Sequence, residues 1–150
     1  MRFIPSLRPT FQRRRAALAF LAAALTLPAL AATPVQGYKV VKTYPVAVGM
    51  PGHPTPTGLF HITDKQVNPV WSVPNSPWAG ELAGTTVDGG SAANPLKARW
   101  MGITDGVGIH GTGEDASVGT RASHGCIRMH VPDVIALYPR VPVGTPVLLK

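Results

Sequence analysis

The sequence predicts a mainly β domain with one or two short helices. Sixteen prolines and sixteen glycines among 150 residues are too many for a helical bundle. Short runs rich in β-branched residues alternate with turn-forming residues, which is typical of a sheet built from short strands. The expected strands are 39–43, 45–48, 58–63, 101–103, 108–110 and 145–149.

Two connections between these runs differ in character. Residues 50–58 contain three prolines and two glycines, which predicts a rigid loop between two strands. Residues 68–94 include Trp71, Trp78 and several prolines and glycines, with little periodicity. A loop of that length in a compact domain is usually functional. The alternative is a covering loop whose tryptophans pack into the core.

One helix is expected after the last histidine of the chain. Pro132 suits a first helical position and Asp133 suits the first turn. An apolar stripe follows, and Pro139 ends the helix after roughly two turns. The stripe consists of Val134, Ile135, Leu137 and Tyr138.

Residues 1–31 predict a secretory signal peptide, followed by a mature domain over 32–150. Five arginines and no acidic residue accompany an apolar segment, 16–27, and an A-x-A cleavage signal at 29–31. The apolar run 16–31 is shorter than the roughly 20 residues of a membrane-spanning helix, although an uncleaved anchor is the alternative. We therefore expect export to the periplasm or cell wall, by the Sec or the twin-arginine route.

The charge of the chain resides mostly in this leader. The whole chain carries a net charge of +7, but without the five leader arginines nine basic residues face seven acidic ones, a net of +2. No basic block with interleaved aromatic residues remains. We expect no nucleic-acid partner, and no stable membrane span once the leader is removed.

Cys126 is the only cysteine of the chain, so it cannot form an intramolecular disulfide. It follows His124 by two residues and precedes Arg128 by two, and His110 lies sixteen residues upstream. Such neighbours can lower a thiol pKa from about 8.5 toward neutrality and produce a nucleophilic thiolate. The alternative is a small buried hydrophobic side chain. We expect a catalytic cysteine.

The same residue types could in principle bind zinc. The candidate ligands are His110, His124, Cys126 and His130. Their spacing lacks a second cysteine pair, and the sequence already carries a complete nucleophile pattern. We expect neither a metal nor another cofactor.

Attack by Cys126 needs a base and a site for the resulting oxyanion. The base takes the thiol proton or holds the thiolate as an ion pair, and His110 and His124 are both candidates. The backbone N–H groups of His124, Gly125 and Cys126 are the natural donors to the oxyanion, with Gly125 allowing the tight turn.

Two more residues beside the cysteine have open roles. Arg128 could bind a substrate carboxylate or form a structural salt bridge with Asp133 or Asp115. Ser123 is expected to hydrogen-bond within the loop, or to contact substrate, rather than to react. The remaining histidines are expected to be loop or surface residues: His53, His61 and His130.

These residues together resemble the L,D-transpeptidase catalytic domain, also called the YkuD domain. That family's signature is a histidine, a spacer of a dozen or more residues, then Ser/Thr-His-Gly-Cys, a hydrophobic residue and arginine. His110, residues 111–122 and residues 123–128 match it in order and spacing. Residues 44–49 and 54–60 also resemble the family's upstream strand and its Pro-Thr-Pro-x-Gly-x-Phe loop.

The resemblance implies a β-sandwich with a helical element and an enzyme that crosslinks peptidoglycan. Such enzymes cut a donor tetrapeptide stem after its third residue, usually a diamino acid, and release D-alanine. The acyl group is held on cysteine and passed to an amine. The resemblance assigns the base to His110, with the backbone carbonyl of Gly111 orienting the imidazole. It implies stem peptides and carbapenem inhibitors as partners.

Two departures from the family pattern leave alternatives. Family domains usually open with a further strand before the segment that matches 38–41, and only 32–37 are available for it. His130-Val131-Pro132 stand where the family often has asparagine, a capping change that should not affect the chemistry. The alternative functions are an L,D-carboxypeptidase, in which water replaces the amine, and a catalytically degenerate cell-wall binding protein.

Overall fold

The computed structural model describes residues 2–3, 23–25 and 39–150, and strands make up most of their regular secondary structure. The strands are β1 (Arg2–Phe3), β2 (Ala23–Leu25), β3 (Lys42–Thr43), β4 (Val48–Gly49), β5 (Gly58–His61), β6 (Lys65–Val67), β7 (Trp71–Ser72), β8 (Thr86–Val87), β9 (Arg99–Thr104), β10 (Val107–Thr112), β11 (Arg121–Ser123), β12 (Ile127–His130) and β13 (Pro146–Leu149). The helical elements are α1 (Val131–Leu137) and the 3₁₀ turns η1 (Pro77–Leu82), η2 (Asp115–Ser117) and η3 (Tyr138–Arg140). The predicted mainly β fold class is confirmed.

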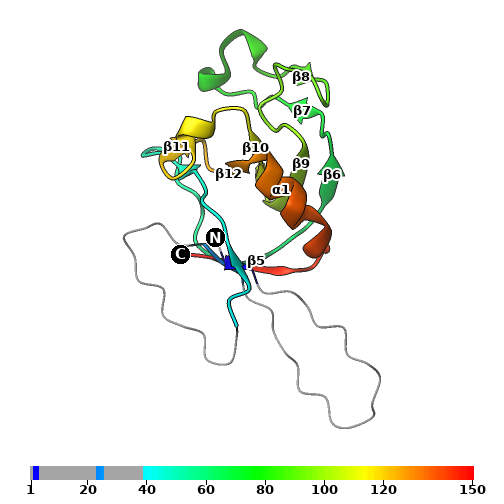
Figure 1. Cartoon of the computed structure of the whole chain (residues 1–150). Coiled ribbons are helices and arrows are strands. Elements are labelled where there is room, and N and C mark those ends of the chain that lie inside the picture. The colour runs from blue at the N-terminus through cyan, green and yellow to red at the C-terminus, as the bar shows by residue number, and fades with distance from the viewer. Residues whose placement is uncertain (1, 4–22, 26–38) are drawn as a thin grey trace.

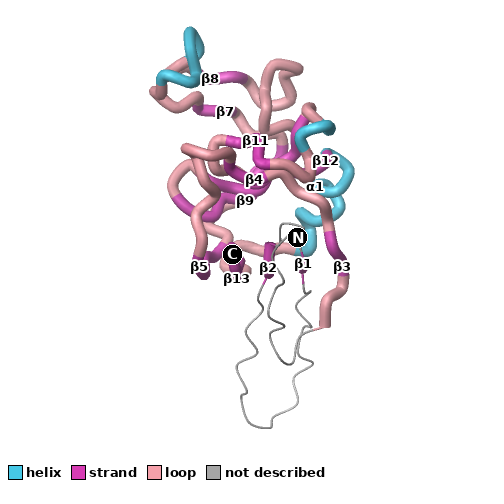
Figure 2. Tube along the Cα trace, turned by 90° about the vertical axis from the view of Figure 1, so that its left-hand side faces the viewer, coloured by secondary structure: helices cyan, strands magenta, loops and turns pink. Residues whose placement is uncertain are grey.

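Two sheets enclose the core. The larger has the strand order β3-β1-β2-β13-β5, and the second has the order β12-β10-β9-β6. Figures 1 and 2 show β5 and β13 at one end of the molecule and β7 and β8 at the other, with β9, β10 and β12 between them. β11 with β4 and β7 with β8 form two further, two-stranded sheets.

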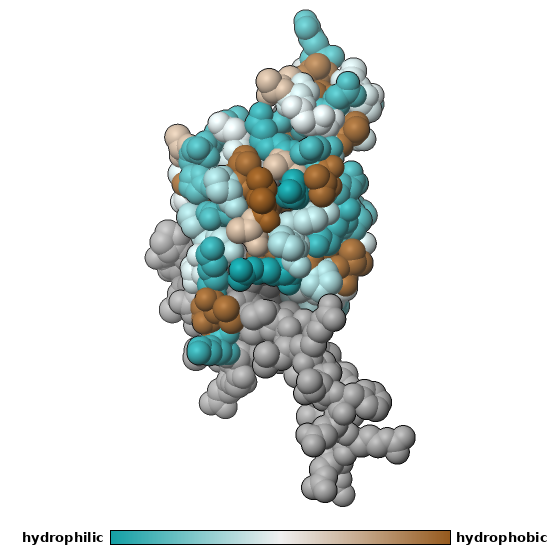
Figure 3. All heavy atoms as spheres, turned by 45° about the vertical axis from the view of Figure 1, so that its right-hand side comes forward, coloured by the Kyte–Doolittle hydropathy of each residue, from teal (hydrophilic) through white to brown (hydrophobic). Residues whose placement is uncertain are grey.

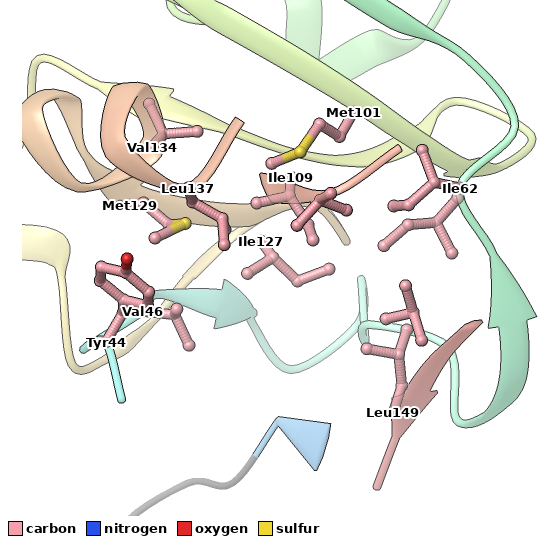
Figure 4. Close-up of a cluster of buried hydrophobic side chains, with 13 residues drawn as sticks. Tyr44, Val46, Ile62, Met101, Ile109, Ile127, Met129, Val134, Leu137 and Leu149 are labelled. Carbon is pink, nitrogen blue, oxygen red and sulfur yellow. The ribbon is translucent and has the colours of Figure 1, made fainter. Parts of the chain in front are cut away.

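The β12-β10-β9-β6 sheet has one face that packs on the apolar core and an opposite face that does not. β10 runs parallel to β12 and antiparallel to β9, with Ile109 opposite Ile127 on one side and opposite Met101 on the other. Because side chains alternate along a strand, these three point to the same face, and all are fully buried. They meet Val147 and Leu149 of β13 in a single cluster, which Figure 4 shows.

Helix α1 packs on this core beside β10. Pro132 lies in its first turn, as predicted, and Val134 and Leu137 are buried. Gly111 of β10 makes room for the helix, because a Cβ there would lie only 3.2–3.3 Å from the side chains of Val131 and Val134. The sequence predicts Ile135 in the apolar stripe, but it is 40% exposed, because it lies about 100° around the helix from Val134, outside the face that Val134 and Leu137 bury.

The long connection 68–94 is not a featureless loop. It contains the β7–β8 pair and η1, and it projects from the rest of the domain in Figures 1 and 2. The two ends of this connection are held together by the buried side-chain amide of Asn94. It donates hydrogen bonds to the backbone carbonyls of Pro69, Val87 and Asp88. Strands of two residues are too short to give a periodic signal, which is why the sequence predicted a loop.

The predicted leader, residues 1–31, lies outside the described residues except for β1 and β2. β2 pairs in parallel with β13, and β1 pairs with β2 and β3. Residues of the predicted leader therefore supply the strand beside β13, and cleavage of the leader stays a prediction. Within the part of the chain that the structure describes, no helix has the length and hydropathy needed to cross a membrane.

The part of the chain that the structure describes has several exposed apolar side chains. On the face drawn in Figure 3 they form separate patches between polar residues. Scattered apolar residues of this kind are ordinary for a folded domain. Among the described residues, the large exposed ones are Val40, Val41, Leu59, Val67, Val70, Trp78, Leu82, Ile135 and Val143.

Candidate active site

The face of the β12-β10-β9-β6 sheet opposite the core lines a pocket of about 590 Å³. Strand register places His110 beside Arg128 on one side and beside Trp100 on the other. Alternation puts these side chains on the face away from Ile109 and Ile127. The pocket is lined by Asp64, Gln66, Pro69, Val70, Trp71, Ser72, Pro74, Trp78, Pro95, Leu96, Trp100, Gly106, His110, Ser123, His124, Cys126 and Arg128.

Cys126 ends a tight loop that joins β11 to β12. The Ser123 hydroxyl donates to the Cys126 carbonyl at 2.5 Å and accepts the Gly125 N–H at 3.2 Å. Gly125 adopts a φ of +112°, which a residue with a side chain rarely adopts. The serine is thus the loop-closing residue that the sequence predicts, and a contact of its side chain with substrate stays a prediction.

Thr55, from the proline-rich loop, holds the cysteine loop from outside. Its hydroxyl accepts the Gly49 N–H at 2.8 Å and donates to the Gly125 carbonyl at 2.9 Å. The Met50 N–H donates to the Ser123 carbonyl at 2.8 Å. Sequence reasoning gave Thr55 no role, because nothing in the sequence shows that residues 70 positions apart are in contact.

Replacing Thr55 with valine removes both of these hydrogen bonds while conserving shape. We expect the free energy of unfolding to fall by about 1–2 kcal/mol, because a buried N–H and a carbonyl lose their partner. Urea denaturation measures the change. Thr57→Val is the matched control, since Thr57 is exposed two positions along the same loop. Equal effects of the two substitutions would contradict a specific role for Thr55.

The free thiol of Cys126 is protonated at neutral pH. Burial raises the pKa of Cys126 above its ordinary value, and a hydrogen bond with the Gly108 backbone and the charge of Arg128 only partly oppose this. The thiol lies 3.5 Å from the Gly106 carbonyl and donates to it. The neighbouring residues in the sequence favour a lowered thiol pKa, and the direction is the opposite because the sequence does not reveal the burial of Cys126.

Alkylation of Cys126 by iodoacetamide should therefore rise with pH without a plateau below pH 9. The reagent consumes thiolate, and a raised pKa keeps the thiolate scarce at neutral pH. Intact-mass measurements from pH 6 to 10 give the rate profile. The same chain unfolded in urea is the control, since its thiol titrates near the ordinary value. A plateau near pH 7 would instead indicate a stable thiolate–imidazolium pair.

His110 is buried, 3% exposed, and its tautomer is fixed. Nδ1 lies 2.7 Å from the Gly111 carbonyl oxygen, which can only accept, so Nδ1 carries the proton and Nε2 keeps a free lone pair. Burial lowers the pKa of His110 to about 4, with Arg128 lowering it further and the Gly111 hydrogen bond opposing. The imidazole is neutral at pH 7, and the expected orientation by Gly111 is present.

His124 is held by aromatic rings from two loops. It stacks on Trp78 with ring centroids 4.0 Å apart, and His53 meets it edge-on at 4.7 Å. Burial, and then the charges of His53 and Arg128, lower its pKa. Trp71 and Trp78 both line the pocket and neither is buried, so these tryptophans cover the site and do not pack into the core.

One of the three expected oxyanion donors, the Gly125 N–H, has a hydrogen-bond partner within the loop. This N–H points to the Ser123 hydroxyl. Between residues 39 and 150 the structure gives no hydrogen-bond partner to the N–H of His124 or of Cys126. These two amides are the remaining candidates.

Arg128 forms an ion pair that sequence reasoning missed. Its guanidinium lies 2.8 Å from the Glu114 carboxylate, whereas Asp115 pairs with His130 at 2.8 Å. Neither Asp115 nor Asp133 is its partner, because β12 and the turn before η2 bring Glu114 opposite the arginine. Among the described residues no three His, Cys, Asp or Glu side chains cluster in a way that could hold a metal ion.

Comparisons with known proteins agree with this geometry. The family model of the L,D-transpeptidase catalytic domain, YkuD, matches residues 29–149. The chain belongs to this family, as its motifs predicted.

Individual relatives include YqjB of Bacillus subtilis (strain 168), which carries an L,D-transpeptidase name. It is 44% identical over 117 residues, and the match covers 74% of this chain and 60% of YqjB. The chain is also similar to the catalytic domain of the E. faecium L,D-transpeptidase, with 30% identity and a TM-score of 0.52 over 71% of this chain and 78% of that one. A third match is the L,D-transpeptidase LdtMt1 in complex with imipenem, with 25% identity and a TM-score of 0.57 over 75% of this chain and 50% of that one.

Proposed function

We propose that this chain is an L,D-transpeptidase that takes an acyl group from a peptidoglycan stem peptide onto Cys126 and transfers it to an amine. The observation that carries the proposal is that Cys126 and a neutral His110, oriented by Gly111, line one pocket. The family and the relatives' names support the reaction class. The chain spans about 60% of the length of YqjB.

The resting pair is a neutral thiol and a neutral imidazole, so the base acts during attack. His110 Nε2 accepts the thiol proton as Sγ bonds to the donor carbonyl carbon. The N–H groups of His124 and Cys126 hold the oxyanion. When the C–N bond breaks, the His110 imidazolium gives its proton to the leaving D-alanine amine, and a thioester remains on Cys126.

The second half-reaction reverses these roles. The acceptor amine attacks the thioester carbonyl while His110 takes its proton, and the expelled Cys126 thiolate recovers that proton. Arg128 would face the carboxylate of the leaving D-alanine, with its Glu114 ion pair fixing the guanidinium. A second half-reaction with water would make the protein an L,D-carboxypeptidase.

Mass spectrometry of defined tetrapeptide muropeptides with the full chain tests the proposal. Crosslinked dimers that have lost one D-alanine support transfer to an amine. Tripeptides alone indicate hydrolysis, and unchanged muropeptides with an unreactive Cys126 indicate a degenerate binding protein.

Export is proposed on the composition of residues 1–31. The basic, apolar and A-x-A segments are those of a secretory leader, and the substrate lies outside the cytoplasmic membrane. Fractionation of cells that express the full chain tests this, with mass spectrometry of the N-terminus to detect cleavage after residue 31. Uncleaved chain in the cytoplasmic fraction would contradict it.

A further inference from the structure

One row of residues crosses the pocket side of the β12-β10-β9-β6 sheet, from Cys126 to Asp64. Gly108 is opposite Gly102, and the parallel register of β10 with β12 extends the row to Cys126. On the far side the Gly102 N–H donates to the Asp64 carbonyl, so Asp64 ends the row next to β6. The two inner positions are glycines, so no side chain rises from them between the thiol and the carboxylate.

The two glycines are covered by the residues at the sides of the row. A Cβ on Gly102 would collide with Asp64 Oδ2, so the carboxylate lies over Gly102. A Cβ on Gly108 would lie 2.6 Å from the Trp100 ring, so the indole lies over Gly108. A ligand that extends from Cys126 toward Asp64 therefore passes over an aromatic surface and ends at a negative charge.

The Asp64 charge is not neutralised by a cation among the described residues. The ion pairs found there are Arg128 with Glu114 and His130 with Asp115, at the other side of the sheet. Asp64 Oδ2 accepts one hydrogen bond, from Thr63 at 3.2 Å, and both residues are exposed. Asp64 lines the same pocket as Cys126 and can bind a cationic group there.

The spacing selects the length of that group. Neighbouring strands lie about 4.8 Å apart, so Gly102 is roughly 10 Å from Cys126 along the row. An extended chain of four methylenes places its ammonium about 6 Å from its own Cα. A charge-assisted hydrogen bond adds about 2.8 Å, which brings the ammonium of an acyl residue on Cys126 to the Asp64 carboxylate.

We propose that Asp64 and Trp100 form a subsite that selects an acyl residue with a terminal ammonium on an aliphatic side chain. The methylenes lie on the indole, and the ammonium meets the carboxylate. This inference rests on the proposed function, because it takes the acyl donor to be a stem peptide. In this inference, the Asp64 carboxylate selects a diamino acid as the third residue of the donor stem.

The test separates binding from turnover. Two tetrapeptides that differ only in the third residue, lysine or the neutral norleucine, are titrated by NMR into Cys126→Ala protein, which cannot react. We expect the lysine peptide to bind about fivefold more tightly, the upper range for an exposed ion pair. Adding Asp64→Asn should remove the difference, and 0.5 M salt should reduce it.

The control is Asp88→Asn, which removes an exposed carboxylate that does not line the pocket. It should leave the lysine preference intact. Equal affinities for the two peptides, or a preference that survives Asp64→Asn, would overturn the inference. Turnover of the same peptides by the wild-type chain is scored separately, so a protein that binds selectively but transfers nothing would refute the proposed function and keep the subsite.

Discussion

Replacing Cys126 with alanine is expected to abolish both transfer and covalent inhibition. Cys126 is the only thiol of the chain, so no second nucleophile can form the thioester. Activity should fall below a few per cent of wild type in the muropeptide assay. Imipenem should add one ligand mass to the wild-type chain and none to the variant, because its strained carbonyl acylates only the cysteine.

Thermal unfolding of Cys126→Ala distinguishes lost chemistry from lost structure. The alanine is close in size to the thiol, so the melting temperature should change little. Cys126→Ser is the matched control: it keeps the hydrogen bond to Gly106 but supplies a hydroxyl, a much weaker nucleophile than a thiolate. Substantial activity in the folded alanine variant would place the nucleophile elsewhere and refute the mechanism.

Replacing His110 with alanine is expected to slow acylation by imipenem at least about 100-fold, the usual contribution of a general base. His124→Ala should lose less, because its ring is engaged with Trp78 and has no fixed proton acceptor. Rapid mixing followed by intact-mass measurement gives both rates. Equal losses would make His124 an equal candidate for the base.

The pH profile of the wild type provides an independent check on His110. The base works only when neutral, and its pKa is about 4. Acylation should therefore stay level as pH falls from 7 to about 5 and decline only near 4. A decline centred near 6.5, the ordinary value for histidine, would show that burial does not set this pKa.

The free energy of unfolding should also depend on the protonation state of His110. The folded pKa is depressed below the unfolded value of 6.5, so the unfolded chain binds the proton first as pH falls. The stability contributed by neutral His110 is fully present above pH 6.5. It is lost as the pH falls from about 6.5 to about 4, and the loss is on the order of 3 kcal/mol. His110→Gln should remove this part of the pH dependence, as measured by urea unfolding at pH 4.5 and 7.

The sequence by itself determined the chemistry-bearing residues and the class of fold. A lone cysteine in a Ser-His-Gly-Cys loop, a histidine sixteen residues before it and short β-branched runs are all local features, readable without knowing which strands pair. Helix α1 followed for the same reason, since Pro132 and the apolar positions after it lie within one segment.

Tertiary structure decided everything that depends on burial and on register. It raised the thiol pKa instead of lowering it, because desolvation outweighs the Arg128 charge. It gave Arg128 the partner Glu114, and it connected Thr55 to a loop 70 residues away. The row from Cys126 to Asp64 exists only because β6, β9, β10 and β12 pair in one register, since a slip of one residue would turn each of these side chains to the opposite face.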